Sequence, residues 1–421
     1  MTDLSTFTDD DHAAMAFIET RKAAMLDRTL EWASFNTGSS NTDGLHVFAP
    51  HLQAAFGGLD AELQTIPTAP IDKIDARGEA VRYQSGPVIR LDARPKAPVQ
   101  VVLTGHYDTV FPAGTFEAIT DLGNGRINGP GVADMKGGLV VMLEALKAFE
   151  AGALKDNLGY RIVLSPDEET GNFASAEHIR QAATGAHIGM TYEPAMETGD
   201  MAGARKGSAI FDIVFHGLAS HAGRAPEQGR SAIYAAAQFV SAIEPLENVR
   251  AGVTFNVGRI DGGGAVNIVP DLAIVRLGVR APDSEAADWA TAEIHAVFDR
   301  VLTRDGLSGH VSGGFYRPPK PLNAAQAVLG QAIAETGVGL GLTVKFVDTG
   351  GVCEGNNVFA AGVPNIDTLG VRGGLIHSPA EFIVVDSLAE RAGLSALILN
   401  RLADGRIDAH KIHSLMEHRH D

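Results

Sequence analysis

Hydrophobic and polar positions alternate with two different periods along the chain, and these periods predict its elements. Between residues 9 and 36, apolar side chains recur at helical spacing behind a start rich in Thr and Asp, which predicts an amphipathic helix. Short apolar runs further on are typical of buried strands. Strands are expected at 62–66, 80–91, 99–104, 160–164 and 187–191, and helices at 139–149 and 175–183. This alternation predicts an α/β fold with a helix-flanked mixed sheet.

The pattern changes after residues 203–207. Strands are then expected at 209–216, 253–260, 272–279 and 311–315, with helices at 231–243 and 284–302. This β-α-β-β-α-β order is typical of a small α+β ferredoxin-like open sheet. Beyond the proline-rich segment 318–321, a helix at 324–335 and a strand at 343–347 resume the first pattern. The sequence therefore predicts a discontinuous domain, residues 1–205 and 317–421, that is interrupted by an inserted domain, residues 206–316.

Composition narrows the possible functions. A chain of 421 residues exceeds what one hydrophobic core usually organises, which agrees with two domains. A net charge of −17 argues against a phosphate-backbone partner, so we expect no nucleic acid binding. The single cysteine excludes an intrachain disulfide and a thiolate metal cluster. We interpret this residue, Cys353, as a buried structural thiol without a catalytic role.

Three further segments bear on location and on ion sites. Residues 1–11 lack a basic or apolar leader pattern, and no segment is apolar enough to span a bilayer, so we expect a cytoplasmic protein without a membrane partner. The terminal histidines have no carboxylate frame, which favours a mobile end over a metal site. They are His410, His413, His418 and His420. The glycine run 262–264 lacks the Lys-Ser/Thr of a phosphate loop and is interpreted as a hairpin turn.

Side chains that can bind metals follow several predicted strands. His106 and Asp108 stand at the end of the apolar run 99–104. Positions i and i+2 of a strand share a face, so Asp108 can accept the second ring proton of His106. Taken alone, such a pair favours a core histidine satisfied by an aspartate. Asp134 lies in the glycine-rich loop 129–138, which taken alone is an ordinary turn.

Further carboxylates and a second histidine complete the set. Glu168 and Glu169 follow the strand at 160–164, at the edge where open α/β sheets bind ligands, although an exposed Glu-Glu pair is commonly a solvated turn. Glu193 follows the strand at 187–191, and His377 lies in a late loop. Two histidines with three or four carboxylates and no cysteine suit a pair of hydrolytic zinc ions.

The order of these motifs resembles that of a known enzyme family. The motifs are His106-Tyr-Asp108, Gly-Val-Ala-Asp134-Met-Lys-Gly-Gly, Asp-Glu168-Glu169-Thr-Gly, Glu193-Pro and the late His377. The series resembles that of the M20 co-catalytic zinc peptidases and deacylases, and most of all the bacterial glutamate carboxypeptidases of the carboxypeptidase G type. The resemblance covers nearly the whole chain and is weakest in the first hundred residues.

The resemblance implies a role for each motif residue. Asp134 would bridge two Zn²⁺ ions in each subunit, with Co²⁺ or Mn²⁺ as replacements. The remaining ligands would be His106 and Glu193 for one ion, and Glu169 and His377 for the other. Glu168 would be the general base, and Asp108 would hold the His106 ring. A cis peptide bond between Asp134 and Met135 is also expected.

The inserted domain contains a second signature. The segment 215–232 around His221 resembles the dimerisation (lid) domain of the same family. The resemblance implies a homodimer in which His221 reaches the partner subunit's active site and donates to the developing oxyanion. Without the resemblance, His221 is interpreted as a turn histidine.

Substrate-binding residues are predicted from the same comparison. Asn267 and Arg317 match positions that hold the substrate's terminal α-carboxylate in glutamate carboxypeptidases, and a guanidinium suits that planar anion. Taken alone, Asn267 would be a turn residue and Arg317 a surface charge before the proline linker. Arg280, at the end of a predicted strand, is interpreted as a structural charge.

The sequence thus predicts a di-zinc amidohydrolase that cleaves an amide bond next to a free carboxylate. Its substrate would be a small N-acyl amino acid or peptide, from which it releases C-terminal glutamate. The alternatives are an N-acyl-amino-acid deacylase of the acetylornithine or succinyl-diaminopimelate type, a dipeptidase, and a relative that binds without catalysis. The last is disfavoured because no predicted ligand or base is missing.

Overall fold

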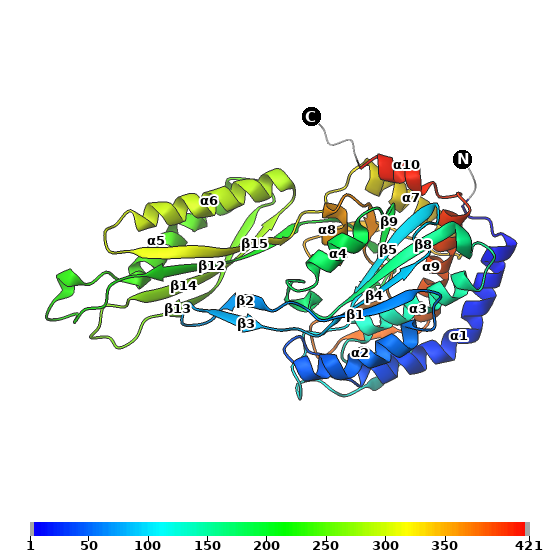
Figure 1. Ribbon diagram of the computed structural model, residues 1–421, viewed down its shortest axis with the longest axis horizontal. Helices are drawn as coiled ribbons and strands as arrows, with labels where there is room; N and C mark the ends of the chain where they lie inside the picture. The colour runs from blue at the N-terminus through cyan, green and yellow to red at the C-terminus, as the bar shows by residue number, and fades with distance from the viewer. Residues whose placement is uncertain (1–3, 417–421) are drawn as a thin grey trace.

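A computed structural model describes residues 4–416 of the chain. Its elements gather in two lobes, each built on its own sheet (Figure 1). A hairpin of β2 (Ile71–Ile74) and β3 (Ala80–Tyr83) lies between the lobes. No helix within the described residues combines the length and the apolar character needed to cross a membrane.

The larger lobe contains a six-stranded mixed sheet. In spatial order its strands are β1 (Glu62–Ile66), β4 (Val88–Ala93), β8 (Leu158–Ser165), β5 (Val99–His106), β9 (Ile188–Thr191) and β17 (Asn365–Ile366). Strand β5 runs parallel to both of its neighbours, with His106 opposite Ser165 and Thr104 opposite Thr191. The carboxyl ends of β5, β8 and β9 therefore meet at one edge, where open α/β sheets place their ligands.

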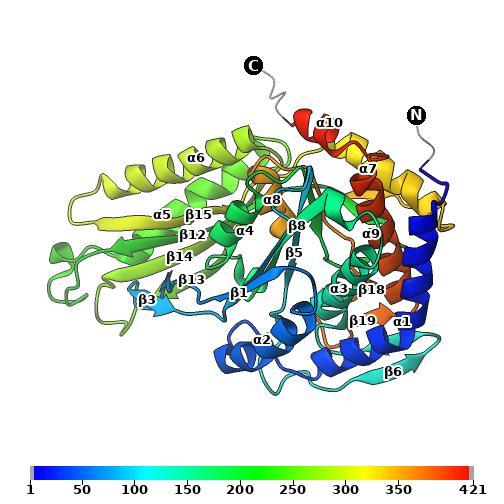
Figure 2. The same ribbon diagram turned by 45° about the vertical axis from the view of Figure 1, so that its right-hand side comes forward.

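Helices cover both faces of this sheet (Figure 2). One face packs against α3 (Gly137–Glu150) and α9 (Ser387–Ala403), on which α1 (Asp9–Ala33) lies, and the other packs against α4 (Ala176–Ala183) and α8 (Glu354–Ala360). Because successive strand side chains point to opposite faces, β5 contributes to two cores. Val101 and Leu103 belong to the first core, and Val102 belongs to the second. The mixed α/β fold predicted from the sequence is confirmed.

The smaller lobe contains an antiparallel sheet of four strands. In spatial order these are β13 (Thr254–Gly262), β14 (Leu272–Ala281), β12 (Gly207–His216) and β15 (Ser308–Arg317). One face packs against α5 (Ala232–Ile243) and α6 (Ser284–Leu302) around a separate hydrophobic core. Phe211, Ile213 and Phe215 of β12 point into that core. Along the chain the elements follow the predicted order of strand, helix, two strands, helix and strand.

Smaller sheets complete the larger lobe and connect it to the smaller one. A five-stranded sheet consists of β10 (Ala195–Met196), β18 (Arg372–Gly374), β19 (Phe382–Val384), β7 (Arg126–Asn128) and β6 (Thr120–Gly123). Strand β11 (Met201–Arg205) pairs with β16 (Phe346–Thr349). The chain leaves the larger lobe after Arg205 and returns before Lys320, and the backbones of these two residues exchange hydrogen bonds of 2.8 and 3.0 Å.

Several predicted elements differ from the structure. The strand expected at 80–91 is two strands, β3 and β4, because a Gly-Pro step at residues 86–87 separates them. The strand expected at 343–347 is β16, which pairs with β11 and not with the main sheet. Helix α2 (Thr42–Phe56) was not predicted, although its buried residues recur at helical spacing. Helix α7 (Ala324–Val338) is three residues longer than expected at its C-terminal end.

The expectation of a mobile C-terminal end is wrong for two of its four histidines. His410 and His413 lie in helix α10 (Ala409–Ser414), and their ring centroids are 4.2 and 5.8 Å from that of His187. His418 and His420 lie outside the described residues. His187 accepts the backbone N–H of Gln100 through Nδ1, so this ring docks the terminal helix against the sheet.

Candidate active site

The parallel strands bring three predicted site segments to one place. His106 is the last residue of β5 and is fully buried. Glu168 and Glu169 lie in a single 3₁₀ turn that follows β8. Glu193 comes just after β9 and is 8% exposed. These side chains are therefore close together because their strands pair in this register, and not because they are close in the sequence.

Asp134 enters the site from an irregular turn. It lies in a π-helical turn, Val132–Lys136, between Gly131 at φ 67° and helix α3. The peptide bond between Asp134 and Met135 is cis, as the family resemblance implied. Backbone N–H groups of Gly131, Ala133 and Asp134 donate to the carboxylate of Glu381 at 2.9–3.2 Å. Glu381 thus fixes the loop, a role that the sequence did not reveal because the two segments are far apart in the chain.

The carboxylate of Asp134 faces a different histidine with each oxygen. Its Oδ1 lies 3.1 Å from His106 Nε2, and its Oδ2 lies 3.2 Å from His377 Nε2. His377 also approaches Glu169 Oε2 at 3.2 Å, while His106 Nε2 lies 3.7 Å from Glu193 Oε1. Asp134 therefore stands between a His106–Glu193 group and a His377–Glu169 group.

Asp108 contacts both His106 and the turn that holds the glutamates. Its Oδ1 lies 3.3 Å from His106 Nδ1, and its own backbone carbonyl lies 3.1 Å from the same nitrogen. The side-chain oxygens also accept the backbone N–H groups of Glu168 and Glu169 at 3.0 and 3.1 Å, and the Ser39 hydroxyl at 2.7 Å. One buried carboxylate therefore positions the histidine and the glutamate turn together.

The crowding of acidic groups shifts their proton affinities. Burial opposes the charged ring of His106, but the charges of Glu193 and the nearby aspartates outweigh it and raise its pKa well above the usual value. Burial and the charge of Asp134 raise the pKa of Glu169 to about 7, and burial raises the pKa of Glu168 well above its usual range. Hydrogen bonds to Asp134 and Glu169 raise the pKa of His377 to about 11. The buried carboxylates of this cluster repel one another, and cations that bind among them relieve this repulsion.

The donor set fits divalent metal ions. Donor atoms of His106, Asp134 and Glu169 lie within 4.8 Å of one another, and so do those of His106, Glu168 and Glu193. Glu193 Oε1 is buried and has no hydrogen-bond partner among the described residues, as expected of an atom that ligates a metal. Imidazole nitrogens and carboxylate oxygens are common ligands of catalytic zinc. The second group includes Glu168, which the sequence assigned as a base and not as a ligand.

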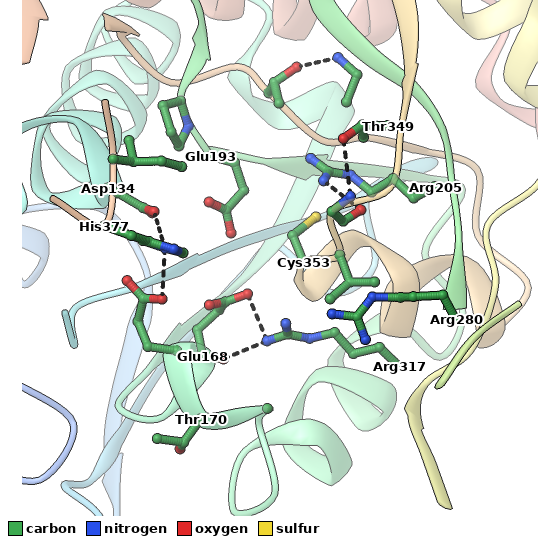
Figure 3. Close-up of a pocket in the computed structure, with 18 of the residues that line it drawn as sticks. Asp134, Glu168, Thr170, Glu193, Arg205, Arg280, Arg317, Thr349, Cys353 and His377 are labelled. Carbon is green, nitrogen blue, oxygen red and sulfur yellow. Dashed lines mark hydrogen bonds and ion pairs between the residues drawn. The ribbon is translucent and has the colours of Figure 1, made fainter. Parts of the chain in front are cut away.

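A cavity of about 700 Å³ opens beside this cluster. Asp134, Glu168, Glu193 and His377 lie on one side of it (Figure 3). Three arginines lie on the other side, namely Arg205, Arg280 and Arg317. The cavity therefore has an acidic wall and a cationic wall.

Arg317 is buried in the cavity wall, so its interpretation as a surface charge is wrong. Its Nη2 lies 2.7 Å from Glu168 Oε1 and donates to the Glu168 carbonyl and to Asn172 Oδ1, both at 2.6 Å. Asn172 in turn donates to Glu354, which is fully buried. The sequence did not single out Asn172 or Glu354, because their polar partners come from other segments.

Arg280 also lines the cavity, although the sequence suggested only a structural charge. Ser208 of β12 pairs with Arg280 of β14 on one side and with Arg317 of β15 on the other. Arg280 donates to the Ser208 hydroxyl, which lies 2.8 Å from the Tyr316 hydroxyl. Only the strand register places the two arginines on either side of Ser208, and register is not visible in a sequence without a known pairing.

His221 and Asn267 lie together, but they do not line this cavity. Both are exposed in the smaller lobe. The Ala222 N–H donates to the Asn267 carbonyl at 2.9 Å, and His221 forms a β-bridge with Ile268. Within one chain, the structure therefore brings together eight of the ten predicted site residues. These are His106, Asp108, Asp134, Glu168, Glu169, Glu193, Arg317 and His377.

Comparison with known proteins decides the family. Residues 102–401, more than half of the chain, match the peptidase family M20/M25/M40. The chain belongs to this family. It is an M20 metallopeptidase, and the predicted resemblance is confirmed.

Individual M20 relatives are distant in sequence. Carboxypeptidase G2 of Pseudomonas sp. (strain RS-16) is 26% identical over 390 residues, which cover 90% of this chain and 89% of the relative. A succinyl-diaminopimelate desuccinylase of Nitrosospira multiformis is 26% identical over 356 residues, covering 79% of this chain and 91% of the relative. The M20 family thus includes relatives of this chain with different substrates.

Solved M20 structures share the fold. A tripeptidase from Staphylococcus aureus superposes with a TM-score of 0.70 at 23% identity, covering 91% of this chain and 99% of that chain. A dinuclear metal binding M20 peptidase from Bacillus subtilis gives a TM-score of 0.61 at 15% identity, covering 90% of this chain and 99% of that chain. That peptidase is described as binding two metal ions, and this chain has its own group of side chains suited to metal.

Proposed function

We propose that this M20 metallopeptidase is a di-zinc amidohydrolase that cleaves an amide bond next to a free carboxylate and releases C-terminal glutamate. The observation that carries the proposal is the position of Asp134, whose two oxygens face His106 and His377. Asp134 would bridge two Zn²⁺ ions, with Co²⁺ or Mn²⁺ as replacements. His106 and Glu193 would complete one ligand set, and Glu169 and His377 the other.

The reaction requires an acid–base group beside the metals. When bound, the two ions would polarise the scissile carbonyl and acidify the attacking water. Glu168 is buried next to the ligands and is the group we assign as general base. It would take a proton from the water and deliver it to the leaving amine. Asp108 would keep the His106 ring and the Glu168 turn in place through the contacts described above.

The cationic wall suits a substrate carboxylate. Arg317 and Arg280 lie on opposite sides of Ser208 and line the cavity opposite the acidic cluster. A guanidinium pairs well with a planar carboxylate, so we assign the substrate's terminal carboxylate to this wall. Arg317 now pairs with Glu168, and a substrate carboxylate at Arg317 would compete with that contact and leave the base free to accept a proton.

Two predicted residues would reach an active site if a second copy of the chain supplied them. His221 and Asn267 are neighbours on the exposed surface of the smaller lobe, so a homodimer could deliver both to the partner subunit's cavity. We therefore propose that residues 206–316 form a dimerisation and lid domain of ferredoxin-like topology. The catalytic domain would comprise residues 1–205 and 317–421. His221 would donate to the developing oxyanion, and Asn267 would help to hold the substrate carboxylate.

A deacylase is the second candidate, favoured by the coverage of the desuccinylase relative. A substrate panel separates it from the carboxypeptidase. The zinc-loaded protein would be assayed with N-acyl glutamates, N-succinyl amino acids, other N-acyl amino acids and dipeptides. We expect the highest kcat/KM for N-acyl glutamates. Preference for N-succinyl substrates would identify a deacylase, and no turnover of any substrate would favour a binding relative.

A further inference from the structure

Arg205 places a third cationic group in the cavity, in addition to Arg280 and Arg317. It is the last residue of β11, is 8% exposed, and lines the cavity next to Gly351 and Cys353. Figure 3 shows its guanidinium turned toward Glu193 and Cys353, away from the Arg280–Arg317 pair. The cationic wall therefore has two separate positive positions.

The charges around Arg205 do not balance. Arg205 and Lys320 both pair with the same buried carboxylate, that of Asp367, and Lys320 Nζ lies 3.1 Å from it. Two cations thus share one anion. Lys320 is 1% exposed and does not line the cavity. Of the two cations, only Arg205 can therefore contact a molecule bound in the cavity. Nearby Glu193 contributes negative charge, but we assign that charge to a metal ion.

Arg205 is also held in a fixed position. Its Nε donates to Asp367, and its Nη1 donates to the Gly351 carbonyl at 3.2 Å. Neither bond uses Nη2. A guanidinium that is already oriented loses little conformational freedom when it binds an anion, which favours tight and selective recognition.

We propose that Arg205 binds a second carboxylate of the substrate, the side-chain carboxylate of the acidic amino acid that is released. Arg317 and Arg280 hold the terminal carboxylate, and Arg205 reads the side chain from the other end of the cationic wall. This inference rests on the proposed function and specifies its substrate class, acidic over neutral side chains. An uncharged side chain of the same size leaves the surplus charge of Arg205 without a partner.

The test compares two substrates that differ only in this charge, N-acetyl-L-glutamate and N-acetyl-L-glutamine. The variants are Arg205→Met, Arg205→Lys and, as a control, Lys320→Met. The control also removes one of the two cations that pair with Asp367, but the Lys320 side chain does not line the cavity. We expect the wild type to prefer the glutamate substrate in kcat/KM. Arg205→Met should reduce this preference roughly 100-fold, whereas Arg205→Lys should retain part of it.

Lys320→Met should lower the melting temperature and weaken the preference far less than Arg205→Met, because it reduces the surplus charge but leaves the Arg205 guanidinium in the cavity. Calorimetric titration with L-glutamate and L-glutamine provides a readout that does not depend on turnover, and Arg205→Met should weaken the binding of L-glutamate alone. Equal rates on both substrates in the wild type, or the same change of preference in Arg205→Met and Lys320→Met, would overturn this inference. Absence of turnover on the whole substrate panel would instead overturn the proposed function.

Discussion

At the residue scale, two side chains of the site each contact more than one functional group. Asp108 holds the His106 ring and the backbone of Glu168 and Glu169, and Asp134 faces two histidines. The Asp108–His106 contact was predicted from the i, i+2 spacing on a strand, although β5 ends at His106 and Asp108 lies just beyond it. The contacts to the glutamate turn were not, because they depend on the register between β5 and β8.

Replacing Asp108 tests this double role. Asp108→Asn keeps the size of the side chain but removes the charge that orients the His106 ring. We expect zinc affinity to fall roughly 10–100-fold, with a lower rate and an unchanged fold. Competition with a chelator and circular dichroism would measure the two effects. Ser39→Ala, which removes only one hydrogen bond to Asp108, is the matched control and should have a much smaller effect. Equal zinc affinity in Asp108→Asn and the wild type would contradict the role.

At the element scale, helix α1 is tied to α9 by a buried ionic contact. Asp11 is fully buried, pairs with Arg406 at 2.8 Å, and accepts from Asn400 of α9 at 3.2 Å. Burial alone would raise the pKa of Asp11, but these donors outweigh burial and lower it. A carboxylate with a lowered folded-state pKa adds stability above its unfolded pKa, and this stability is lost as the pH falls through the folded value.

Asp11→Asn should therefore destabilise the protein by about 3 kcal/mol at pH 7, because it leaves the buried Arg401 and the partly buried Arg406 without their shared anion. As the pH falls below the usual aspartate pKa and through the lowered folded-state pKa of Asp11, the wild type also loses the charge, so the difference between the two proteins should shrink. Urea unfolding at pH 7 and at lower pH measures it. A difference that stays constant or grows toward low pH would contradict the account of this contact.

Most elements were predictable because their periodicity is strong. Helix α6 begins and ends where the sequence predicted, and β1 does as well. The failures have local causes. Residues 80–91 show a continuous strand-like pattern, but their Gly-Pro step ends one strand and begins another. Arg280 was misjudged because the sheet order, in which β12 with Ser208 lies between the strands of Arg280 and Arg317, is not visible in the sequence.

At the scale of the whole molecule, the cavity of one chain lacks His221 and Asn267. If a second copy supplies them, two inactive variants should restore each other. In a heterodimer of Glu168→Gln and His221→Ala, one site combines an intact Glu168 with an intact His221 from the partner. Random mixing should recover about one quarter of wild-type activity, because half of the dimers are mixed and each has one working site.

Activity of co-expressed and separately purified variants measures this recovery. A doubly substituted chain, with both changes in one subunit, mixed with the wild type controls for simple dilution. If the mixture of the two variants shows no more activity than either variant alone, His221 acts within its own subunit or not at all, and the proposed dimeric site is wrong.

The central proposal is that Asp134 would bridge two metal ions beside Glu168. The most direct measurement is a zinc titration of the chelator-stripped protein, with bound metal and rate of hydrolysis followed together. We predict two zinc ions per chain in the wild type, with activity returning as the sites fill, and two zinc ions per chain in Glu168→Gln with a rate about 10²–10⁴-fold lower. Full turnover by the metal-free protein, or binding of a single ion at full activity, would contradict the account.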